Sequence, residues 1–159
     1  MKVLLLGGSG NLGRHLCSKM SERNIDFHSP TSQQCNIMKP HEIHFRNVDV
    51  VIHSAGISDM LQAEENPTEC IDINVLGTMN IVRLCRKLNK RLVYISTDVV
   101  FSGKNSPYTN ESGVNPINVY GMSKACGELL VKTLSNYAII RAPFVKGKVF
   151  NHPKAFSNQ

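Results

Sequence analysis

A tyrosine and a lysine four residues apart have the side chains needed for acid–base chemistry. Tyr120 and Lys124 stand in the segment YGMSK, at the start of a predicted helix. A spacing of four residues places both side chains on one helix face. An ammonium beside a phenol favours the phenolate and lowers the pKa of the tyrosine. The pair therefore predicts a proton donor and acceptor that works near neutral pH.

Hydroxyl groups at a predicted strand end add a third element. Ser96, Thr97 and Asp98 come directly after the apolar run RLVYI, which indicates a buried strand. A hydroxyl at that position can hydrogen-bond the oxygen of a substrate. We expect these residues to take part in the same site as the tyrosine and the lysine.

The glycine-rich segment GGSGNLG predicts a phosphate-binding loop. Gly7, Gly10 and Gly13 have the spacing GxxGxxG, directly after a predicted strand and at the start of a predicted helix. The first glycine permits a tight turn, the second lets the backbone approach a pyrophosphate, and the third lets the helix pack on the strand. The free N–H groups and positive end of the helix then face the anion. This context favours nucleotide binding over a purely structural turn.

The residues after the second predicted strand favour NADP(H) over NAD(H). A unit that binds NAD usually carries a carboxylate about 20 residues beyond the glycine loop, where it binds the ribose hydroxyls. The segment FHSPTS, residues 27–32, has no carboxylate. Arg14 follows the last glycine of the loop, where a cation meets a 2′-phosphate, and Ser29, Thr31 and Ser32 add hydroxyls. The alternative is that Arg14 is an ordinary solvated helix residue.

Apolar runs that alternate with helical patterns must position these groups. We predict strands at residues 2–6, 25–29, 48–53, 91–96 and 137–141, with a strand stub at 34–37. We predict helices at 11–23, 67–89 and 118–135, and a loop at 97–116. The buried stripe of the long helix is expected at Ile71, Val75, Met79 and Val82. This alternation indicates an α/β fold with a parallel sheet covered on both faces, which binds ligands at the carboxyl ends of its strands.

Composition excludes several other classes of protein. The 159 residues suit one domain, and 42% hydrophobic with 19% charged residues excludes collagen, disorder and a coiled coil. No apolar run is long enough for a membrane helix or a signal peptide. Five scattered cysteines without zinc spacing predict reduced thiols, no metal site and a cytoplasmic location.

The net charge of +6 favours anionic partners, and it also keeps a protein in solution. Only 6% of the residues are aromatic and there is no Trp, so the sequence has no platform for stacking bases. We therefore expect a phosphorylated small molecule as the partner, with no nucleic acid and no membrane.

The order of these motifs resembles the extended short-chain dehydrogenase/reductase family. GxxGxxG is followed by a strand that ends in HSAG (53–56), by STDxVF (96–101) and by YxxxK (120–124). The stretch STDVVFSGKNSPYTNESGVNPINVYGMSKACGE, residues 96–128, resembles the dTDP-4-dehydrorhamnose reductase branch, which also contains the methionine adenosyltransferase β subunit. The resemblance runs from residue 1 to about 145. It implies a three-layer, doubly wound, Rossmann-type parallel sheet.

The resemblance also implies roles for individual residues. Thr97, Tyr120 and Lys124 match the catalytic set, with Thr97, Asp98, Phe101 and Tyr120 near the substrate. Asn74 matches an asparagine that supports the site. Asn36 stands where the family usually has Asp near the adenine, which weakens that one assignment. The residues that match the cofactor-binding positions are Gly7, Gly10, Asn11, Leu12, Gly13, Arg14, Asn36, Ile37, Ser54, Ala55, Gly56, Tyr120, Lys124, Pro143, Phe144 and Val145.

The implied reaction is the reduction of a nucleotide-linked 4-keto-6-deoxysugar by NAD(P)H. Hydride goes to the ketone carbon and Tyr120 gives a proton to the oxygen. Lys124 holds the ribose hydroxyls and lowers the pKa of Tyr120, while Thr97 orients the carbonyl.

The family continues beyond residues 137–141 with a seventh strand and a small substrate domain, for which the last residues leave no room. We therefore expect a cofactor-binding domain over residues 1–145 and, over 146–159, a short tail that begins the missing substrate-binding part. The last predicted strand becomes an exposed edge, and the sugar pocket lacks one wall. A fragment, a truncated product, a cofactor-binding remnant, a homo-oligomer and a partner chain that completes the sheet all stay open.

Two other functions also stay open. One is a non-catalytic, cofactor-binding regulatory protein similar to the β subunit. The other is a sugar-nucleotide epimerase or dehydratase. Dehydratases of this family usually place an acid–base pair after the threonine of the STD segment, and here Val99 follows Asp98, which disfavours that reaction.

Overall fold

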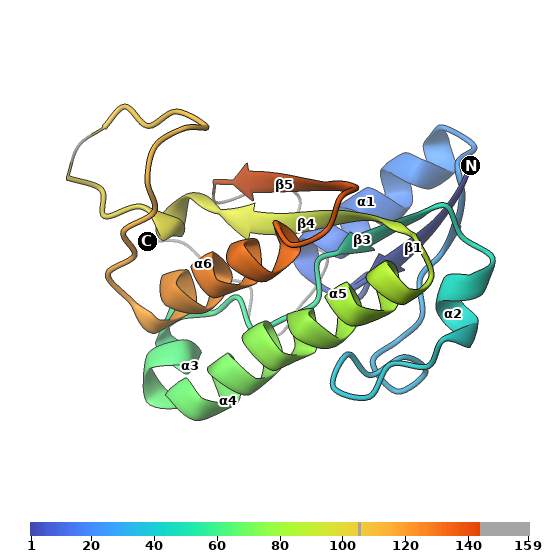
Figure 1. Cartoon of the computed structure of the whole chain (residues 1–159), viewed down its shortest axis with the longest axis horizontal. Helices are drawn as coiled ribbons and strands as arrows, with labels where there is room; N and C mark the ends of the chain where they lie inside the picture. Colours follow the sequence, from blue (N-terminus) through green and yellow to red (C-terminus); the bar gives the residue numbers. More distant parts are fainter. Residues whose placement is uncertain (105, 144–159) are drawn as a thin grey trace.

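Five runs of the sequence form the strands of one sheet in the computed structural model of the chain, which describes residues 1–104 and 106–143 (Figure 1). The strands are β1 (Lys2–Leu6), β2 (Asp26–His28), β3 (Val50–His53), β4 (Arg91–Thr97) and β5 (Tyr137–Ala142). All neighbouring strands are parallel, in the order β2-β1-β3-β4-β5. The predicted parallel sheet is confirmed.

The helices match the sequence prediction in part. The structure contains α1 (Asn11–Glu22), α2 (Ile43–Arg46), α3 (Met60–Glu65), α4 (Pro67–Ile71), α5 (Gly77–Lys87) and α6 (Val119–Val131). A π-helical turn, η1 (Asp72–Leu76), joins α4 to α5, and a 3-10 turn, η2 (Asp98–Val100), follows β4. The short helices α2 and α3 were not predicted, since four and six residues show too little periodicity.

Helix ends follow the local sequence. The Asn118 side chain caps α6 by accepting a hydrogen bond from Gly121 N at 2.7 Å. Both α1 and α5 are followed by an asparagine in the left-handed region, Asn24 (φ 53°) and Asn89 (φ 49°). The amide after each asparagine then bonds back to the last helical turn, Ile25 N to Met20 O and Lys90 N to Cys85 O. This is the Schellman arrangement, which satisfies carbonyls that the helix leaves free.

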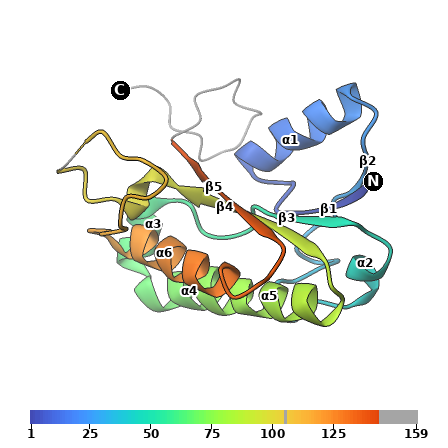
Figure 2. The ribbon, with the colours of Figure 1, turned by 45° about the horizontal axis from the view of Figure 1, so that its top comes forward.

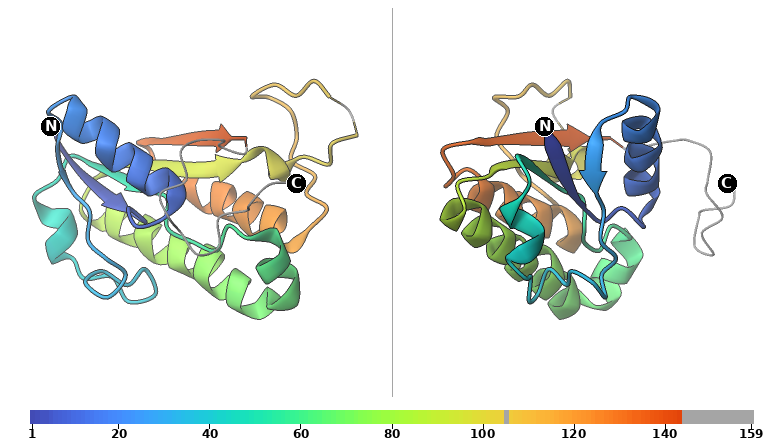
Figure 3. Two further views of the ribbon diagram at one scale, coloured as in Figure 1. Left: turned by 180° about the vertical axis from the view of Figure 1, so that it is seen from behind. Right: turned by 90° about the vertical axis from the view of Figure 1, so that its right-hand side faces the viewer.

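The sheet lies between two layers of helices (Figure 2 and Figure 3). Alternation along β1 decides which side chains face which layer. Val3 and Leu5 pack with Met20 of α1 on one face. Leu4 and Leu6 face the larger core, which α5 covers with Ile81, Val82 and Cys85, and which Val131 of α6 and Leu134 just beyond it complete. The expected three-layer, doubly wound arrangement is therefore confirmed.

The buried stripe predicted for the long helix is confirmed at Val82, which is 4% exposed, but it is wrong at its other end. Ile71 is 39% exposed, whereas its neighbour Cys70 is completely buried. The inward face continues through Asn74 and Thr78 to Ile81. Two of these inward residues are polar and make buried hydrogen bonds, so counting apolar residues alone selects the wrong face.

The stub expected at residues 34–37 is not a strand. Its backbone is used in local turns instead, since Gln34 N and Cys35 N both donate to Thr31 O, at 3.0 and 2.9 Å. Asn36 accepts a hydrogen bond from Met38 N at 2.9 Å. Asparagine side chains commonly form turns of this kind, which compete with strand pairing.

The outer edge of β5 has no neighbouring strand within residues 1–104 and 106–143, as expected. Ile140 on this strand is 48% exposed. The tail predicted for residues 146–159 lies outside the described residues. Within the described part of the chain, no helix has the length and apolar character that crossing a membrane requires.

One glycine of α6 is required by the core. A Cβ added at Gly127 would overlap the Tyr94 hydroxyl and lie 2.7 Å from its Cζ, and Tyr94 is completely buried. We expect Gly127→Ala to destabilise the chain by about 1–3 kcal/mol, since the core must shift to accept the methyl group. Urea unfolding followed by circular dichroism measures this change.

Gly113→Ala is the matched control, since nothing lies within 4 Å of an added Cβ there. It is expected to change the unfolding free energy by less than about 0.5 kcal/mol. Equal midpoints for the two variants would contradict this description of the core.

Candidate functional site

The strand order reverses between β1 and β3, and a cleft of about 670 Å³ opens at their carboxyl ends. An open α/β sheet binds its ligands at such a switch point. A smaller hollow of about 190 Å³ lies beside Arg86 and Lys90, away from the motifs. The residues that line the larger cleft are Leu6, Gly7, Ser9, Gly10, Pro30, Ser32, Gln33, Cys35, Asn36, Ile37, Met38, Ser54, Ala55, Gly56, Ile57 and Ile73.

The glycine loop fits against the loop that follows β3. Gly7 has φ of +91°, and an added Cβ would lie 2.5 Å from Ala55 N and 2.6 Å from Ser54 C. Gly13 packs on the same turn, where an added Cβ would lie 2.6 Å from Gly8 Cα. Both positions therefore exclude any side chain, and the backbone of the loop stays open on its cleft side, as a bound pyrophosphate requires.

The amino end of α1 supplies hydrogen-bond donors to this loop. Gly10 is the N-cap and provides no side-chain cap, and the first turn of α1 contains no acidic residue. The first N–H groups of a helix have no partner within it, so those of Asn11, Leu12 and Gly13 suit an anion. Arg14 Nε donates to Ser9 O at 2.9 Å, which holds the guanidinium beside the loop. The chain therefore brings a cation and a helix end together, as a phosphorylated dinucleotide requires.

The opposite wall of the cleft is fixed by α5. Asn80 Nδ2 donates to the carbonyls of Ile37 and Met38, at 3.2 and 3.0 Å. Gly77 leaves room for Ile37, whose Cδ1 would lie 2.8 Å from an added Cβ. Asn36 and Ile37 thus lie on the cleft wall, where the resemblance places the adenine. The Asn36 side chain is already engaged in its local turn.

Two predicted catalytic residues lie together at the end of β4. The Thr97 hydroxyl donates to Asp98 Oδ1 at 3.1 Å and accepts from Val99 N at 3.1 Å. Tyr120 approaches the same point from the first turn of α6, close enough for Thr97 to affect its pKa. An added Cβ at Gly121 would lie 2.5 Å from Val99 O, so this glycine lets α6 approach the turn that carries Asp98.

The expected effect of Lys124 on Tyr120 is not found. Burial raises the pKa of Tyr120, the neighbouring Thr97 side chain acts against the rise, and Asp98 adds to it. Lys124 is nearly buried and its Nζ lies 4.1 Å from the centroid of the Tyr94 ring. Burial lowers the pKa of Lys124 to about 7, although Glu128 acts in the opposite direction. Tyr120 is therefore a protonated phenol. The charge of the Lys124 ammonium is stabilised by the face of the Tyr94 ring and not by a Tyr120 phenolate.

Asn74 joins the cleft to the first turns of α6. Its Nδ2 donates to Ile57 O and to Ser123 Oγ, both at 2.9 Å, and its Oδ1 accepts from Ile57 N at 2.8 Å. Asn74 is 2% exposed and lies on the π-helical turn, which turns its amide toward both partners. A π-helical turn inside a helix is frequent at functional sites. The Asn74 side chain therefore holds both the loop after β3 and α6, the helix that carries Lys124.

The remaining predicted residues lie around this centre. Asp98 is exposed, and Phe101 stacks on Tyr108 with ring centroids 4.2 Å apart. Pro143 follows Ala142, the residue that pairs with Thr97 across β4 and β5. Phe144 and Val145 lie outside the described residues.

Sequence reasoning missed several residues of the site. Cys35 and Met38 line the cleft, and Asn80 and Ser123 support its walls. Ser123 lies inside the YxxxK segment, so its place beside Lys124 could have been inferred from helical spacing. The other three follow no motif, and only the packing of α5 on the segment after β2 brings them to the site.

Residues 1–158 match the family described as the RmlD substrate binding domain. A putative UDP-glucose 4-epimerase of Methanocaldococcus jannaschii is 31% identical over 92% of the chain and 56% of its own length. The methionine adenosyltransferase 2 subunit beta of Bos taurus is 30% identical over 93% of the chain and 48% of its own length. The chain therefore spans about half the length of the curated relatives it matches.

A solved structure with the same fold contains a cofactor. The dTDP-4-dehydrorhamnose reductase of Bacillus anthracis, in complex with NADP, aligns with a TM-score of 0.84 and 30% identity. The alignment covers 94% of the chain and 56% of that protein.

The buried lysine makes stability depend on pH. Because the pKa of Lys124 falls from 10.5 when exposed to about 7 in the fold, the unfolded chain binds more protons between these values. The unfolding free energy therefore rises with pH across this window, and the cost of burying the charge is greatest below pH 7. We expect Lys124→Met to stabilise the fold by about 1–4 kcal/mol at pH 6. That gain should fade toward pH 10 in thermal unfolding.

Lys132→Met is the control, since Lys132 is exposed just beyond the end of the same helix. It should change stability by less than about 0.5 kcal/mol at both pH values. A gain from Lys124→Met that is equal at pH 6 and pH 10 would show that the lysine is not buried as a charge.

Proposed function

The chain belongs to the family described as the RmlD substrate binding domain, and on this premise we propose that it binds NADP(H) and reduces a nucleotide-linked 4-keto-6-deoxysugar. The observation that carries the proposal is the meeting of Thr97 and Tyr120 at the carboxyl end of β4. A buried asparagine joins that point to a cleft built on a glycine loop. We further propose that residues 1–145 form the cofactor-binding domain and that the protein works in the reducing cytoplasm, which its five free cysteines support.

The cleft supports NADP(H) as the cofactor. When bound, the reduced nicotinamide supplies a hydride. The backbone of Gly7, Gly10 and Gly13 would hold the pyrophosphate, and Asn36 and Ile37 would border the adenine. The position of Arg14 beside Ser9 O supports a contact with a 2′-phosphate. No carboxylate is present in the segment 27–32 to hold a free ribose hydroxyl instead.

The groups of this chain then have defined roles in the reduction. The Thr97 hydroxyl orients the sugar carbonyl by hydrogen bonding its oxygen. As the carbonyl carbon gains hydride, the Tyr120 hydroxyl donates its proton to that oxygen, so the ketone becomes an alcohol and a phenolate remains until solvent returns a proton. The raised pKa of Tyr120 keeps its hydroxyl protonated beforehand. Lys124 would bind the ribose hydroxyls.

Two relatives support other functions. The similarity to a methionine adenosyltransferase subunit supports a regulatory protein that binds the cofactor without turnover. The similarity to a putative UDP-glucose 4-epimerase supports chemistry on a sugar nucleotide other than net reduction. Product analysis separates these functions, because reduction consumes NADPH, epimerisation leaves it unchanged, and a regulatory protein yields no product.

The test is to remove the proton donor. We expect Tyr120→Phe to lower the rate of NADPH oxidation with a dTDP-linked 4-keto-6-deoxysugar by about 10²–10⁴-fold, the usual contribution of a positioned acid. NADPH affinity, measured by the fluorescence of the cofactor, should stay unchanged.

Tyr137→Phe is the control, because Tyr137 begins β5 at the opposite end of the strand from Thr97. It should retain the rate of the parent chain. Retention of that rate by Tyr120→Phe would instead remove this tyrosine from the mechanism.

A further inference from the structure

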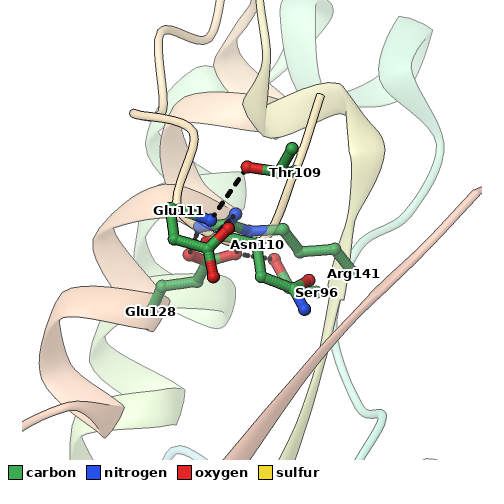
Figure 4. Close-up of polar contacts among 6 residues, drawn as sticks. All are labelled: Ser96, Thr109, Asn110, Glu111, Glu128 and Arg141. Carbon is green, nitrogen blue, oxygen red and sulfur yellow. Dashed lines mark hydrogen bonds and ion pairs between the residues drawn. The ribbon is translucent and has the colours of Figure 1, made fainter. Parts of the chain in front are cut away.

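A buried ion pair joins α6 to β5 beside the proposed site (Figure 4). Arg141 Nε donates to Glu128 Oε1 at 2.9 Å and Nη2 donates to Oε2 at 2.8 Å, which makes the pair bidentate. Ser96, the neighbour of Thr97, donates to Glu128 Oε1 at 2.7 Å. The side chains of Arg141 and Glu128 are 17% and 2% exposed. Such a pair is fixed in one geometry.

The carboxylate of Glu128 is held in its charged form. Burial acts to raise its pKa, but the hydrogen bonds from Arg141 and Ser96 outweigh burial and lower it. The pair is therefore ionised at neutral pH. A buried ion pair is weak evidence for a role in stability alone, since apolar residues of similar size often serve as well.

The outer side of the guanidinium contacts the loop between η2 and α6. Arg141 Nη1 donates to Asn110 O at 3.4 Å, and its Cζ lies 4.9 Å from the centroid of the Phe101 ring. Phe101 stacks on Tyr108 with an angle of 5° between the rings. One side chain on the sheet therefore contacts both the start and the middle of the loop.

Together with η2, this loop connects the two residues proposed to bind the carbonyl. The connection leaves β4 just after Thr97 and enters α6 just before Tyr120, so we expect it to border a substrate held between them. It extends beyond the carboxyl end of the sheet (Figure 1). Asn115 N donates to Val100 O at 2.9 Å and closes the base of the loop. Other bonds, such as that between Ser102 Oγ and Tyr108 Oη at 3.3 Å, join residues within the loop. Arg141 provides contacts that fasten its more distant part to β5.

We infer that Glu128 and Arg141 are positioning residues, whose ion pair holds residues 101–104 and 106–110 of the loop against the carboxyl end of the sheet as one wall of the site for the nucleotide sugar. The inference rests on the proposed function for the identity of the ligand, but not for the fastening of the loop. Glu128 fixes the orientation of the Arg141 guanidinium. The guanidinium then contacts the Phe101 ring, and this contact holds the loop in place. Lysine cannot replace arginine here, because an ammonium has neither the fork nor the flat face.

Two variants test the pair without leaving a bare charge in the core. Arg141→Lys keeps a cation beside Glu128, and Phe101→Leu removes only the stacked ring on the loop. Arg86→Lys is the matched control, because Arg86 bonds Thr133 O and Oγ1, at 3.0 and 2.6 Å, at the amino end of the sheet. Thermal unfolding first establishes that each variant is folded at the assay temperature.

The first readout needs no substrate. Lys104 is exposed in the loop, and its cleavage by trypsin, identified by mass spectrometry of the products, reports how firmly the loop is held. We expect Arg141→Lys and Phe101→Leu to speed this cleavage about tenfold, the change expected when one charge-assisted contact is lost. Arg86→Lys should leave the cleavage rate unchanged. An unchanged rate in Arg141→Lys would overturn the inference.

The second readout concerns the ligand. With a dTDP-linked 4-keto-6-deoxysugar, we expect KM to rise about tenfold in both loop variants while kcat and NADPH affinity are retained, because the wall binds sugar nucleotide and not cofactor. A loss of NADPH affinity together with KM would overturn the inference in favour of a general structural role. If the parent chain has no turnover, the proposed function fails, and the cleavage rates still decide whether the ion pair fastens the loop.

Discussion

Because strands β1 to β5 run parallel, their carboxyl ends meet at one edge, and this constraint places the groups of the chain that can do chemistry. The reversal of strand order between β1 and β3 separates the loops that follow them and leaves the cleft. The approach of Gly7 to Ala55 then sets the floor of that cleft without any side chain. Thr97 stands at the end of β4 at the same edge, and α6 brings Tyr120 to it. The site is a consequence of topology first and of individual residues second.

This arrangement buries a layer of polar side chains between the sheet and α6, which costs folding free energy. Lys124 lies on the Tyr94 ring, Asn74 holds Ser123, and Glu128 pairs with Arg141. Each buried polar group needs a partner, because an unsatisfied one costs about 1–3 kcal/mol. A fold selected only for stability could fill this layer with apolar residues. The layer is instead consistent with a function that needs a charge and an aligned helix beside the cleft.

Much of the fold follows from the sequence, because long apolar runs are buried wherever a parallel sheet has helices on both faces. The long helix shows the limit, since Asn74 turns inward on a π-helical turn and shifts the buried face away from Ile71. The motifs predicted that Thr97 and Tyr120 share one site, and in the fold both lie at the carboxyl end of β4. Spacing did not give the raised pKa of Tyr120, which depends on burial. Nor did it give the pairing of Glu128 with Arg141, because only the tertiary fold brings α6 beside β5.

We propose that the cleft between β1 and β3 holds a dinucleotide next to Thr97 and Tyr120. Hydrogen–deuterium exchange of the chain with saturating NADPH, compared with NADH and with no cofactor, tests this proposal. We expect protection of the backbone at residues 7–14, 36–38 and 54–57, stronger with NADPH than with NADH because of Arg14. Binding that protects the region around Arg86 and Lys90 instead, or no protection in a folded chain, would contradict it.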